Sequence, residues 1–467
     1  MSEFARQPVS GNAPEPWRVH ATAVLRIGLP LVGSHLAQIA IGVTDTVMLG
    51  WYGVPALAAG ALGSSLFSLL MLVGSGFAWA VMPLAAAAAN RNDDAQLRAV
   101  ARMGLWLSAA YAVAVLPLMF WSETLLLRGQ DPDVAAGAQA YLRILCVGMF
   151  PALFAMVAKS YLSALEHTRG ILWVTLVAAG GNALANWTLI FGNFGFPELG
   201  LDGAALASVL SHGTALGGLL LYSRFSRELR SRAILARIWC PDWSACRQVF
   251  RLGWPIGITT LAEAGLFAAS AIMVGMLGEG VLAAHGIAMQ LASITFMVHL
   301  GLSQVATVRA GRAASSGDRA DLQRGAVVVL CFSAAFSTLA IGAFLLLPEA
   351  LTGLFLSSSD ARAAQIQPIA ITLLALAALF QLADGLQVIV LGLLRGLQDT
   401  RVPMLVTTIS YWCVGAPASY LLAFGLGFGG PGVWSGLVIG LALAALGLSW
   451  RFIRQLQALV PGERAVG

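Results

Sequence analysis

Residues 56–88, ALAAGALGSSLFSLLMLVGSGFAWAVMPLAAAA, run for 33 positions without one charged side chain. Apolar residues follow one another in this stretch instead of alternating with polar ones. A membrane-spanning helix needs about 20 such residues, whereas the strands of a membrane barrel alternate with a period of two. Because hydrocarbon offers no hydrogen-bonding partner to a free backbone group, the run predicts a transmembrane helix.

The composition of the whole chain extends this prediction. Hydrophobic residues make up 58% of the 467 positions, charged residues make up 10%, and the mean hydropathy is +0.80. A water-soluble protein carries charge on about a quarter of its residues. Similar apolar runs predict an all-α polytopic membrane protein with twelve transmembrane helices, near residues 25–48, 56–88, 98–121, 138–163, 171–192, 203–223, 250–275, 281–308, 324–347, 364–394, 403–425 and 432–453.

Basic residues predict the orientation. The termini and the loops after even-numbered spans, together with the span ends beside them, hold 23 of the 27 bases. The loops after odd-numbered spans hold only Arg128 and Arg362, and the other two bases, Arg143 and Lys159, fall inside the fourth span. Basic loops stay in the cytoplasm, so both termini are expected there. This placement also explains the net charge of +5, and no nucleic-acid partner is expected.

The two halves of the chain repeat each other. Both halves contain six spans, an even number, so both enter the membrane from the same side. This predicts a parallel repeat of two six-helix lobes, related by an axis along the membrane normal. At an ungapped offset of 225, Arg26, Gly28, Pro30, Gly50, Gly53, Gly76 and Asp93 match Arg251, Gly253, Pro255, Gly275, Gly278, Gly301 and Asp318; at an offset of 232, Thr168 and Arg169 match Thr400 and Arg401.

The repeat suggests the boundaries of the domains. The expected parts are a cytoplasmic tail over 1–22, an amino-terminal lobe over 23–224, an Arg-rich cytoplasmic linker over 225–247, a carboxy-terminal lobe over 248–455 and a cytoplasmic tail over 456–467. The first twenty residues are polar and lack the apolar core of a cleaved signal, so the first span is expected to be retained. Pro30, Pro151, Pro255 and Pro417 fall inside spans and are candidate kinks.

Three acidic residues lie well inside the predicted spans: Asp45 in the first, Glu263 in the seventh and Asp384 in the tenth. A charged side chain at the centre of a bilayer costs at least about 2.5–3.5 kcal/mol, which makes intramembrane acids candidates for function. At the repeat offset Glu263 corresponds to Gln38, one heptad before Asp45 on the same helix face. Gln381 lies three residues before Asp384 and shares its face.

Such acids have two interpretations. A single buried carboxylate can serve packing alone, but three of them in a repeat-built chain favour exchange of a proton for Na⁺ or for a cationic substrate. Asn182 and Asn186 lie four apart on one face of the fifth span, and either help Asp45 to hold a cation or form ordinary interhelical hydrogen bonds. Lys159 is expected to snorkel or to pair internally.

The energy source is predicted by elimination. Lys159 is the one lysine of the chain, and no Gly-rich phosphate-binding loop precedes it. Walker-type ATP binding is therefore excluded within this chain. Unless a separate ATPase subunit exists, the driver is an ion gradient, with H⁺ or Na⁺ as the coupling ion and no other cofactor.

Several motifs occur in order along residues 20–455. They are Thr44-Asp45-Thr46-Val47-Met48-Leu49-Gly50, Leu57-Ala58-Ala59, Gly253-Trp254-Pro255-Ile256-Gly257, Glu263, Leu282-Ala283-Ala284-His285-Gly286-Ile287-Ala288, the stretch from Asp384 through Leu394-Arg395-Gly396 to Pro403-Met404, and Gly432-Val433-Trp434-Ser435-Gly436. In this order and spacing they resemble the multidrug and toxic compound extrusion (MATE) family, in its bacterial NorM-like branch.

The resemblance implies a V-shaped pair of lobes in the bacterial inner membrane that exports amphipathic, often cationic drugs against H⁺ or Na⁺ by alternating access. It implies a monomer whose partners are these small molecules and membrane lipid, and no enzymatic activity. The ion- or proton-coupling residues are then Asp45, Asn182, Asn186, Ser208, Glu263 and Asp384. The substrate-binding residues are Gln38, Asp45, Glu263, Phe296, Gln381 and Asp384, and Asp45, Glu263 and Asp384 are the ligands if the ion is Na⁺.

Two departures from the family pattern leave the identity of the coupling ion, H⁺ or Na⁺, open. Phe380 stands where some relatives have a tyrosine, and Asn186 stands where some have an aspartate. One alternative is a flippase for lipid-linked precursors, whose pyrophosphate needs several bases, whereas the interiors of the predicted spans carry only Arg143 and Lys159. A membrane-embedded prenyl transferase is a further alternative, but it needs clustered aspartates for Mg²⁺.

Overall fold

The computed structural model describes residues 16–122, 126–127, 131–232, 237–356 and 362–459. These residues contain twelve helices long and apolar enough to span a membrane, which confirms the predicted number. The first six are α1 (Trp17–Tyr52), α2 (Val54–Asn90), α3 (Asp94–Phe120), α5 (Pro132–Ala164), α6 (Thr168–Phe191) and α7 (Gly200–Phe225). The others are α8 (Trp243–Gly275), α9 (Glu279–Ser316), α10 (Arg319–Leu346), α12 (Ala363–Gly396), a composite helix over 401–425 and α15 (Gly429–Ala458).

The composite eleventh span is irregular. Its α-helical parts are α13 (Arg401–Thr408) and α14 (Ala416–Tyr420), each followed by a π-helical segment, η3 (Ile409–Gly415) and η4 (Leu421–Gly425). Pro417 lies between these two segments, whereas Pro30, Pro151 and Pro255 lie inside helices that continue past them. Three short helices lie in the connections: α11 (Pro348–Gly353), η1 (Asn193–Gly195) and η2 (Arg230–Arg232).

Most helices extend beyond the predicted apolar spans, and four of them, α3, α5, α8 and α10, begin at an aspartate whose side chain caps the helix. Asp93 precedes α3 and accepts a hydrogen bond from the backbone amide of Gln96 at 2.9 Å. Its repeat equivalent, Asp318, precedes α10 and accepts one from the amide of Asp321 at 2.9 Å. The repeated loop aspartates are therefore helix N-caps.

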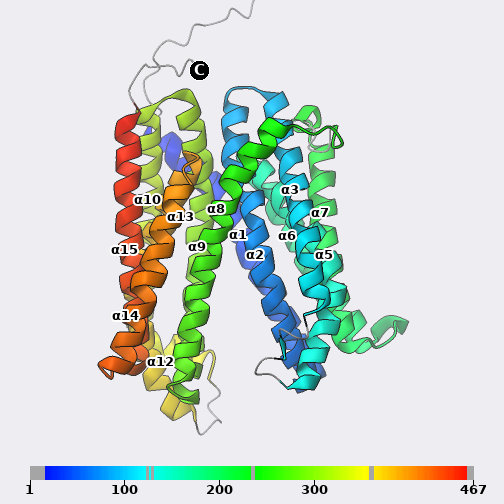
Figure 1. The fold of residues 1–467 in the computed structure, drawn as a ribbon, viewed down its shortest axis with the longest axis vertical. Coiled ribbons are helices and arrows are strands. Elements are labelled where there is room, and N and C mark those ends of the chain that lie inside the picture. Colours follow the sequence, from blue (N-terminus) through cyan, green and yellow to red (C-terminus); the bar gives the residue numbers. More distant parts are fainter. Residues whose placement is uncertain (1–15, 123–125, 128–130, 233–236, 357–361, 460–467) are drawn as a thin grey trace, which may run out of the picture.

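The twelve helices form two lobes, α1–α7 and α8–α15, that meet at one end and diverge toward the other (Figure 1). One buried apolar cluster joins the lobes where they meet, with Leu97, Ala164, Ala313 and Leu394 among its members. Two further clusters lie one in each lobe. The shared core at one end and the separate cores beyond it produce the V shape.

The lobes cross in a way that follows the repeat. A methyl group added at Gly76 of α2 would overlap the backbone of Gly253 and Gly257 in α8. At the equivalent crossing, one added at Gly301 of α9 would contact the side chain and backbone of Val32 in α1. Glycine at the two matched positions lets helices of opposite lobes approach closely, as small residues do in membrane helix pairs.

We expect Gly76→Ala to destabilise the protein. The methyl group has no room at the α2–α8 crossing, and overpacking of this kind costs about 1–3 kcal/mol. The midpoint of thermal unfolding in detergent should therefore fall by several degrees. Gly180→Ala in α6 is the matched control, because no atom lies within 4 Å of the added carbon and alanine is the better helix former. Equal midpoints for the two variants would contradict the close crossing.

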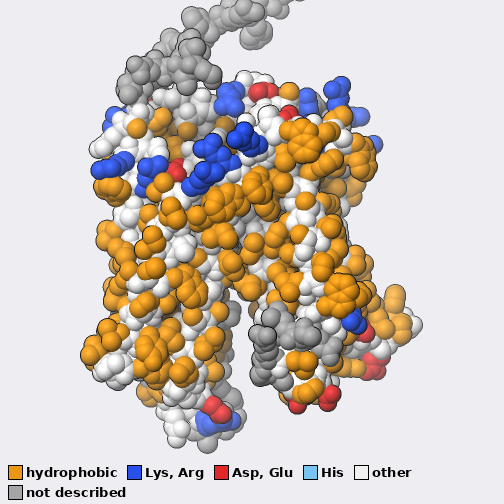
Figure 2. Space-filling model, in the orientation of Figure 1, with side chains coloured by type: hydrophobic (Ala, Val, Ile, Leu, Met, Phe, Trp, Pro, Cys, Tyr) orange, Lys and Arg blue, Asp and Glu red, His pale blue; other side chains and the backbone are white. Residues whose placement is uncertain are grey.

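Basic residues gather at the end where the lobes meet, here called the basic end (Figure 2). Arg91 directly follows α2, and Arg312 and Arg451 lie in the last turns of α9 and α15, which end there. Polar contacts between lobes also lie there. Arg312 of α9 forms an ion pair with Glu166, just after α5, and donates to the carbonyl of Ala164 at 3.0 Å. Figure 2 shows the surface hollowed between the lobes on the opposite side, so the cleft opens away from the basic end.

Candidate functional site

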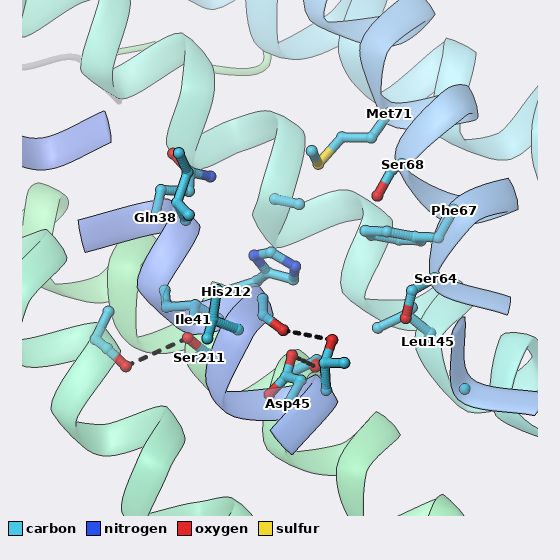
Figure 3. Close-up of a pocket in the computed structure, with 18 of the residues that line it drawn as sticks. Gln38, Ile41, Asp45, Ser64, Phe67, Ser68, Met71, Leu145, Ser211 and His212 are labelled. Carbon is cyan, nitrogen blue, oxygen red and sulfur yellow. Dashed lines mark hydrogen bonds between the residues drawn. The ribbon is translucent and has the colours of Figure 1, made fainter. Parts of the chain in front are cut away.

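The larger of two cavities in the cleft has a volume of about 680 Å³. Its wall comes mainly from α1, α2, α5 and α7 of the first lobe, while α9 of the second lobe contributes Ser293 and Met297. Figure 3 shows Gln38 and Asp45 on one helix, with His212 between their levels and Phe67 on the facing wall. The cavity is therefore apolar for the most part, with a few polar groups.

Asp45 accepts hydrogen bonds from two residues that are distant in the sequence, and a third residue contacts the first of them. Asn186 of α6 donates from Nδ2 to Oδ1 of Asp45 at 2.5 Å, and Ser208 of α7 donates to Oδ2 at 3.2 Å. The same Nδ2 contacts Oδ1 of Asn182 at 3.2 Å. Asn182 and Asn186 are fully buried, and Nδ2 of the first and Oδ1 of the second have no hydrogen-bond partner in the protein. The cluster can therefore satisfy a bound water or cation as well as the carboxylate.

The smaller cavity, of about 360 Å³, lies mainly in the second lobe. Ser293 and Met297 line this cavity too, so the two cavities adjoin across α9. The acids of the smaller cavity are Glu263 of α8 and Asp384 of α12. Asp384 is only 1% exposed, which places its carboxyl group away from bulk water.

Several buried polar atoms beside the smaller cavity have no hydrogen-bond partner in the protein. They are both carboxylate oxygens of Asp384, Oε1 of Glu263, both amide atoms of Gln387 and the hydroxyl of Tyr411. Buried polar groups are almost always hydrogen-bonded, so such a group of orphans needs protons, water or an ion. The oxygens come from carboxylates, an amide and a phenol, which suit a proton or a hard cation such as Na⁺. The Nε of Arg395, also buried without a hydrogen-bond partner, places a positive charge beside the same cavity.

Eight of the nine predicted site residues fall into two groups. The structure brings Asp45, Asn182, Asn186 and Ser208 together, with Gln38 on the wall of the same cavity, and brings Glu263, Asp384 and Phe296 together in the other. The three predicted Na⁺ ligands are thus divided between lobes. In agreement, the described residues include no group of three or more His, Cys, Asp and Glu side chains able to hold a metal ion.

Gln381 lines neither cavity and belongs to neither group. It is fully buried, and its Nε2 donates to the hydroxyl of Thr295 at 2.5 Å. It lies three residues before Asp384 on the same helix face, and its contact with Thr295 joins α12 to α9. Its role in substrate binding stays a prediction.

The expectation that only Arg143 and Lys159 are basic within spans is wrong. Arg395 lies inside α12, lines the smaller cavity and stacks 5.2 Å from the ring of Trp79. It was placed just outside the tenth span because the apolar run ends at Leu394. The motif Leu394-Arg395-Gly396, part of the resemblance to the MATE family, is the feature of the sequence that could have marked Arg395 as a site residue. Arg143, by contrast, donates to the carbonyl of Phe120 at 3.1 Å and lines neither cavity.

Comparisons with known proteins agree with this architecture. The MatE family model matches residues 30–188 and 255–421, which is more than half of the chain. A protein of Rhizobium meliloti (strain 1021) named as a probable multidrug resistance protein NorM is 45% identical over 461 residues, covering 98% of this chain and 98% of the relative. One of the same name from Pseudomonas aeruginosa is 37% identical, covering 96% of this chain and 92% of the relative.

Solved structures show the same fold. The crystal structure of the eukaryotic MATE transporter AtDTX14 superposes with a TM-score of 0.85 at 20% identity, covering 95% of this chain and 98% of that one. A structure described as the outward-facing conformation of a multidrug resistance MATE family transporter of the MOP superfamily gives a TM-score of 0.84 at 20% identity, covering 94% and 96%. The chain belongs to the MatE family, in its NorM-like branch, and is a multi-pass membrane transporter and not an enzyme.

Proposed function

We propose that this transporter is a secondary multidrug exporter that moves amphipathic, often cationic compounds outward in exchange for H⁺ or Na⁺. The observation that carries the proposal is the pair of adjoining cavities, each with its own carboxylate site, between lobes that meet only at the basic end. The names of the relatives, probable multidrug resistance proteins, support it.

The larger cavity suits an amphipathic cation. Phe67, Met71 and Leu145 supply apolar surface around Asp45, whose charge lies in a low-dielectric setting where its attraction for an ammonium group is strong. A cavity of about 680 Å³ lies within the usual range for small-molecule sites. We therefore assign the drug to the cavity at Asp45.

The smaller cavity suits the coupling ion. Glu263 and Asp384 lie close together among orphaned oxygens, so a proton or Na⁺ bound there would relieve both repulsion and desolvation. Phe380 lines this cavity and offers no hydroxyl ligand. Because residue 186 is asparagine and not aspartate, Asp45 is the acid of its hydrogen-bonded cluster. H⁺ and Na⁺ both remain candidates for the coupling ion, and the ion-coupling role predicted for Asp45 is tested together with that of the smaller cavity.

Transport by alternating access requires the cleft to open at the other end. Contacts that must break for this are the ion pair of Arg312 with Glu166 and the bonds from Asn90 of α2 to Ser315 and Ser316 of α9, at 3.0 and 2.7 Å. We place the basic end and both termini in the cytoplasm of a bacterial inner-membrane protein, because basic residues favour that side. The structure then faces outward. We propose that the transporter acts as a monomer.

A flippase for lipid-linked precursors fits the cavities less well. A pyrophosphate needs several bases at one place, whereas the larger cavity is lined by one, Lys159, and the smaller by one, Arg395. Each base shares its cavity with at least one acid. The separate bases therefore favour small amphiphiles over a pyrophosphate.

Efflux from proteoliposomes tests the proposal. Vesicles holding the purified protein are loaded with a fluorescent lipophilic cation, and inward H⁺ and Na⁺ gradients are imposed separately. We expect efflux with one of the two gradients and none without a gradient, since a secondary transporter has no other driver. Gradient-independent efflux that needs ATP would contradict the proposal, and protein-free vesicles give the background.

A further inference from the structure

An apolar groove of about 530 Å³ lies at the surface of the first lobe. Its sides come from α3, α5 and α7, and Trp106, Val113, Phe154 and Leu216 are among the residues that line it. None of its lining residues is charged, and none of them lines either cavity of the cleft. The groove is therefore a feature of its own, separate from the two cavities.

Residues 237–242, which lead into α8, close one end of the groove. Ile238 and Trp239 of this segment line it. The indole Nε1 of Trp106 donates to the carbonyl of Ile238 at 2.9 Å, and the guanidinium of Arg102 donates to the carbonyl of Arg237 at 3.4 Å. The start of α3 follows directly on the end of α2 at the basic end. The segment 237–242 is therefore fixed against α3 at the end of the groove that is nearer the basic end.

Three arginines border this end of the groove. Arg224 follows Leu220 by four residues and so continues the face of α7 that lines the groove. Both Arg224 and Arg237 are exposed, and among the described residues neither forms an ion pair. Arg102 is only 9% exposed, and its Nε has no hydrogen-bond partner in the protein. The groove thus ends beside positive charge that no direct contact with an acid balances.

The groove lies at the depth of one leaflet of a bilayer. Trp106 and Trp239 flank its basic end, and tryptophan is enriched where a membrane meets water. From Leu105 to Val113 the groove follows α3 for about 12 Å away from that end. Over the first lobe in Figure 2, basic side chains border a surface of hydrophobic ones. A molecule in the groove would therefore have its polar part among the arginines and its apolar part along α3.

We propose that this groove binds an anionic phospholipid of the leaflet that borders the basic end. One acyl chain would lie beside α3, and the phosphate group would lie near Arg102, Arg224 and Arg237. Basic residues beside a membrane attract anionic headgroups. A phosphatidylcholine offers the same chain, but its choline group adds a positive charge among the three arginines. The inference does not depend on which compounds the transporter exports.

Photochemical labelling in micelles tests the site. The probes are a phosphatidylglycerol with a diazirine halfway along one acyl chain and a phosphatidylcholine with the same chain. Each is added at increasing mole fraction to the purified full-length protein in a nonionic detergent, and labelled peptides are identified by mass spectrometry after illumination. We expect phosphatidylglycerol to label residues 105–113 and 216–220 at a lower mole fraction than phosphatidylcholine does.

Variants at exposed positions show which features bind the lipid. Arg224→Gln/Arg237→Gln should raise the mole fraction of phosphatidylglycerol needed for half-maximal labelling on the order of tenfold or more, with little change for phosphatidylcholine. Arg401→Gln/Arg454→Gln is the charge-matched control, because it removes two exposed arginines of the second lobe. Ala110→Phe should reduce labelling of the groove by both lipids, since its ring fills the groove from an exposed position. Unchanged midpoints of thermal unfolding verify that the variants are folded.

Four outcomes would overturn the inference while leaving the proposed export untouched. Equal labelling of the groove by the two lipids in wild type would mean that it holds ordinary annular lipid only. An equal effect of the two double variants would assign the attraction to the charge of the whole face. Labelling that spares residues 105–113 and 216–220, or that is unchanged in Ala110→Phe, would place the lipid outside the groove.

Discussion

Asp384→Asn should abolish gradient-driven efflux while the protein remains folded and inserted. The amide has nearly the shape of the carboxyl group, so the packing of α12 is kept. It can neither take up and release a proton nor place a full negative charge beside Na⁺. Asp384 is 1% exposed and both of its oxygens lack a hydrogen-bond partner in the protein, so its charge is not balanced by a direct contact. Efflux in proteoliposomes should fall to the level of protein-free vesicles.

Binding measurements distinguish lost coupling from lost drug binding. If the two cavities have separate roles, Asp384→Asn should still bind a fluorescent lipophilic cation in detergent with an affinity close to that of wild type. Glu349→Gln is the control, since this exposed acid of α11 lies in neither cavity. Full gradient-driven efflux by a Glu263→Gln/Asp384→Asn double variant would remove the ion-coupling role from this pair.

Asp45→Asn should produce the opposite pattern. The substitution keeps a hydrogen-bonding side chain for Asn186 and Ser208 but removes the negative charge from the larger cavity. Loss of one partner of a buried ion pair costs about 2–5 kcal/mol, which corresponds to a loss of affinity for a bound cation of about 30-fold or more. Fluorescence titration of the purified variant with the lipophilic cation should show this change, and efflux should fall accordingly.

The control for Asp45→Asn is Asp202→Asn, which removes an exposed acid from the first turn of α7, outside both cavities. Ion binding at Glu263 and Asp384 should survive in Asp45→Asn and can be followed by isothermal titration with Na⁺ or by proton release on binding. Unchanged affinity for the lipophilic cation in Asp45→Asn would mean that the drug does not use this carboxylate.

Much of the architecture was predictable from local composition. Uninterrupted apolar runs predicted twelve helices, and the recurrence of Pro30 as Pro255 and of Gly76 as Gly301 predicted two parallel lobes. These features are local because each spanning helix satisfies its own backbone. Helix ends were less predictable, because capping residues such as Asp93 extend helices beyond the apolar runs that mark the hydrocarbon.

The candidate site was predictable only in part. The cost of a charge in hydrocarbon singled out Asp45, Glu263 and Asp384 without any knowledge of their neighbours. Arg395 was missed as a cavity residue because the end of an apolar run does not tell how deep the next side chain lies. Gln381 was predicted from its spacing to Asp384, but the spacing does not reveal its hydrogen bond to Thr295 of α9.

The sequence by itself determined the number of spans, their repeat and the acids that need a function. Tertiary structure alone decided which of these groups meet. It brings Asp45 into contact with Asn186 and Ser208, and Lys159 into contact with Gln38, at one cavity. The other two acids line a second cavity. The physical reason is that lipid and helix neighbours are equally apolar. The pattern of hydrophobic residues therefore does not reveal which face of a membrane helix points inward, and only packing sets its rotation.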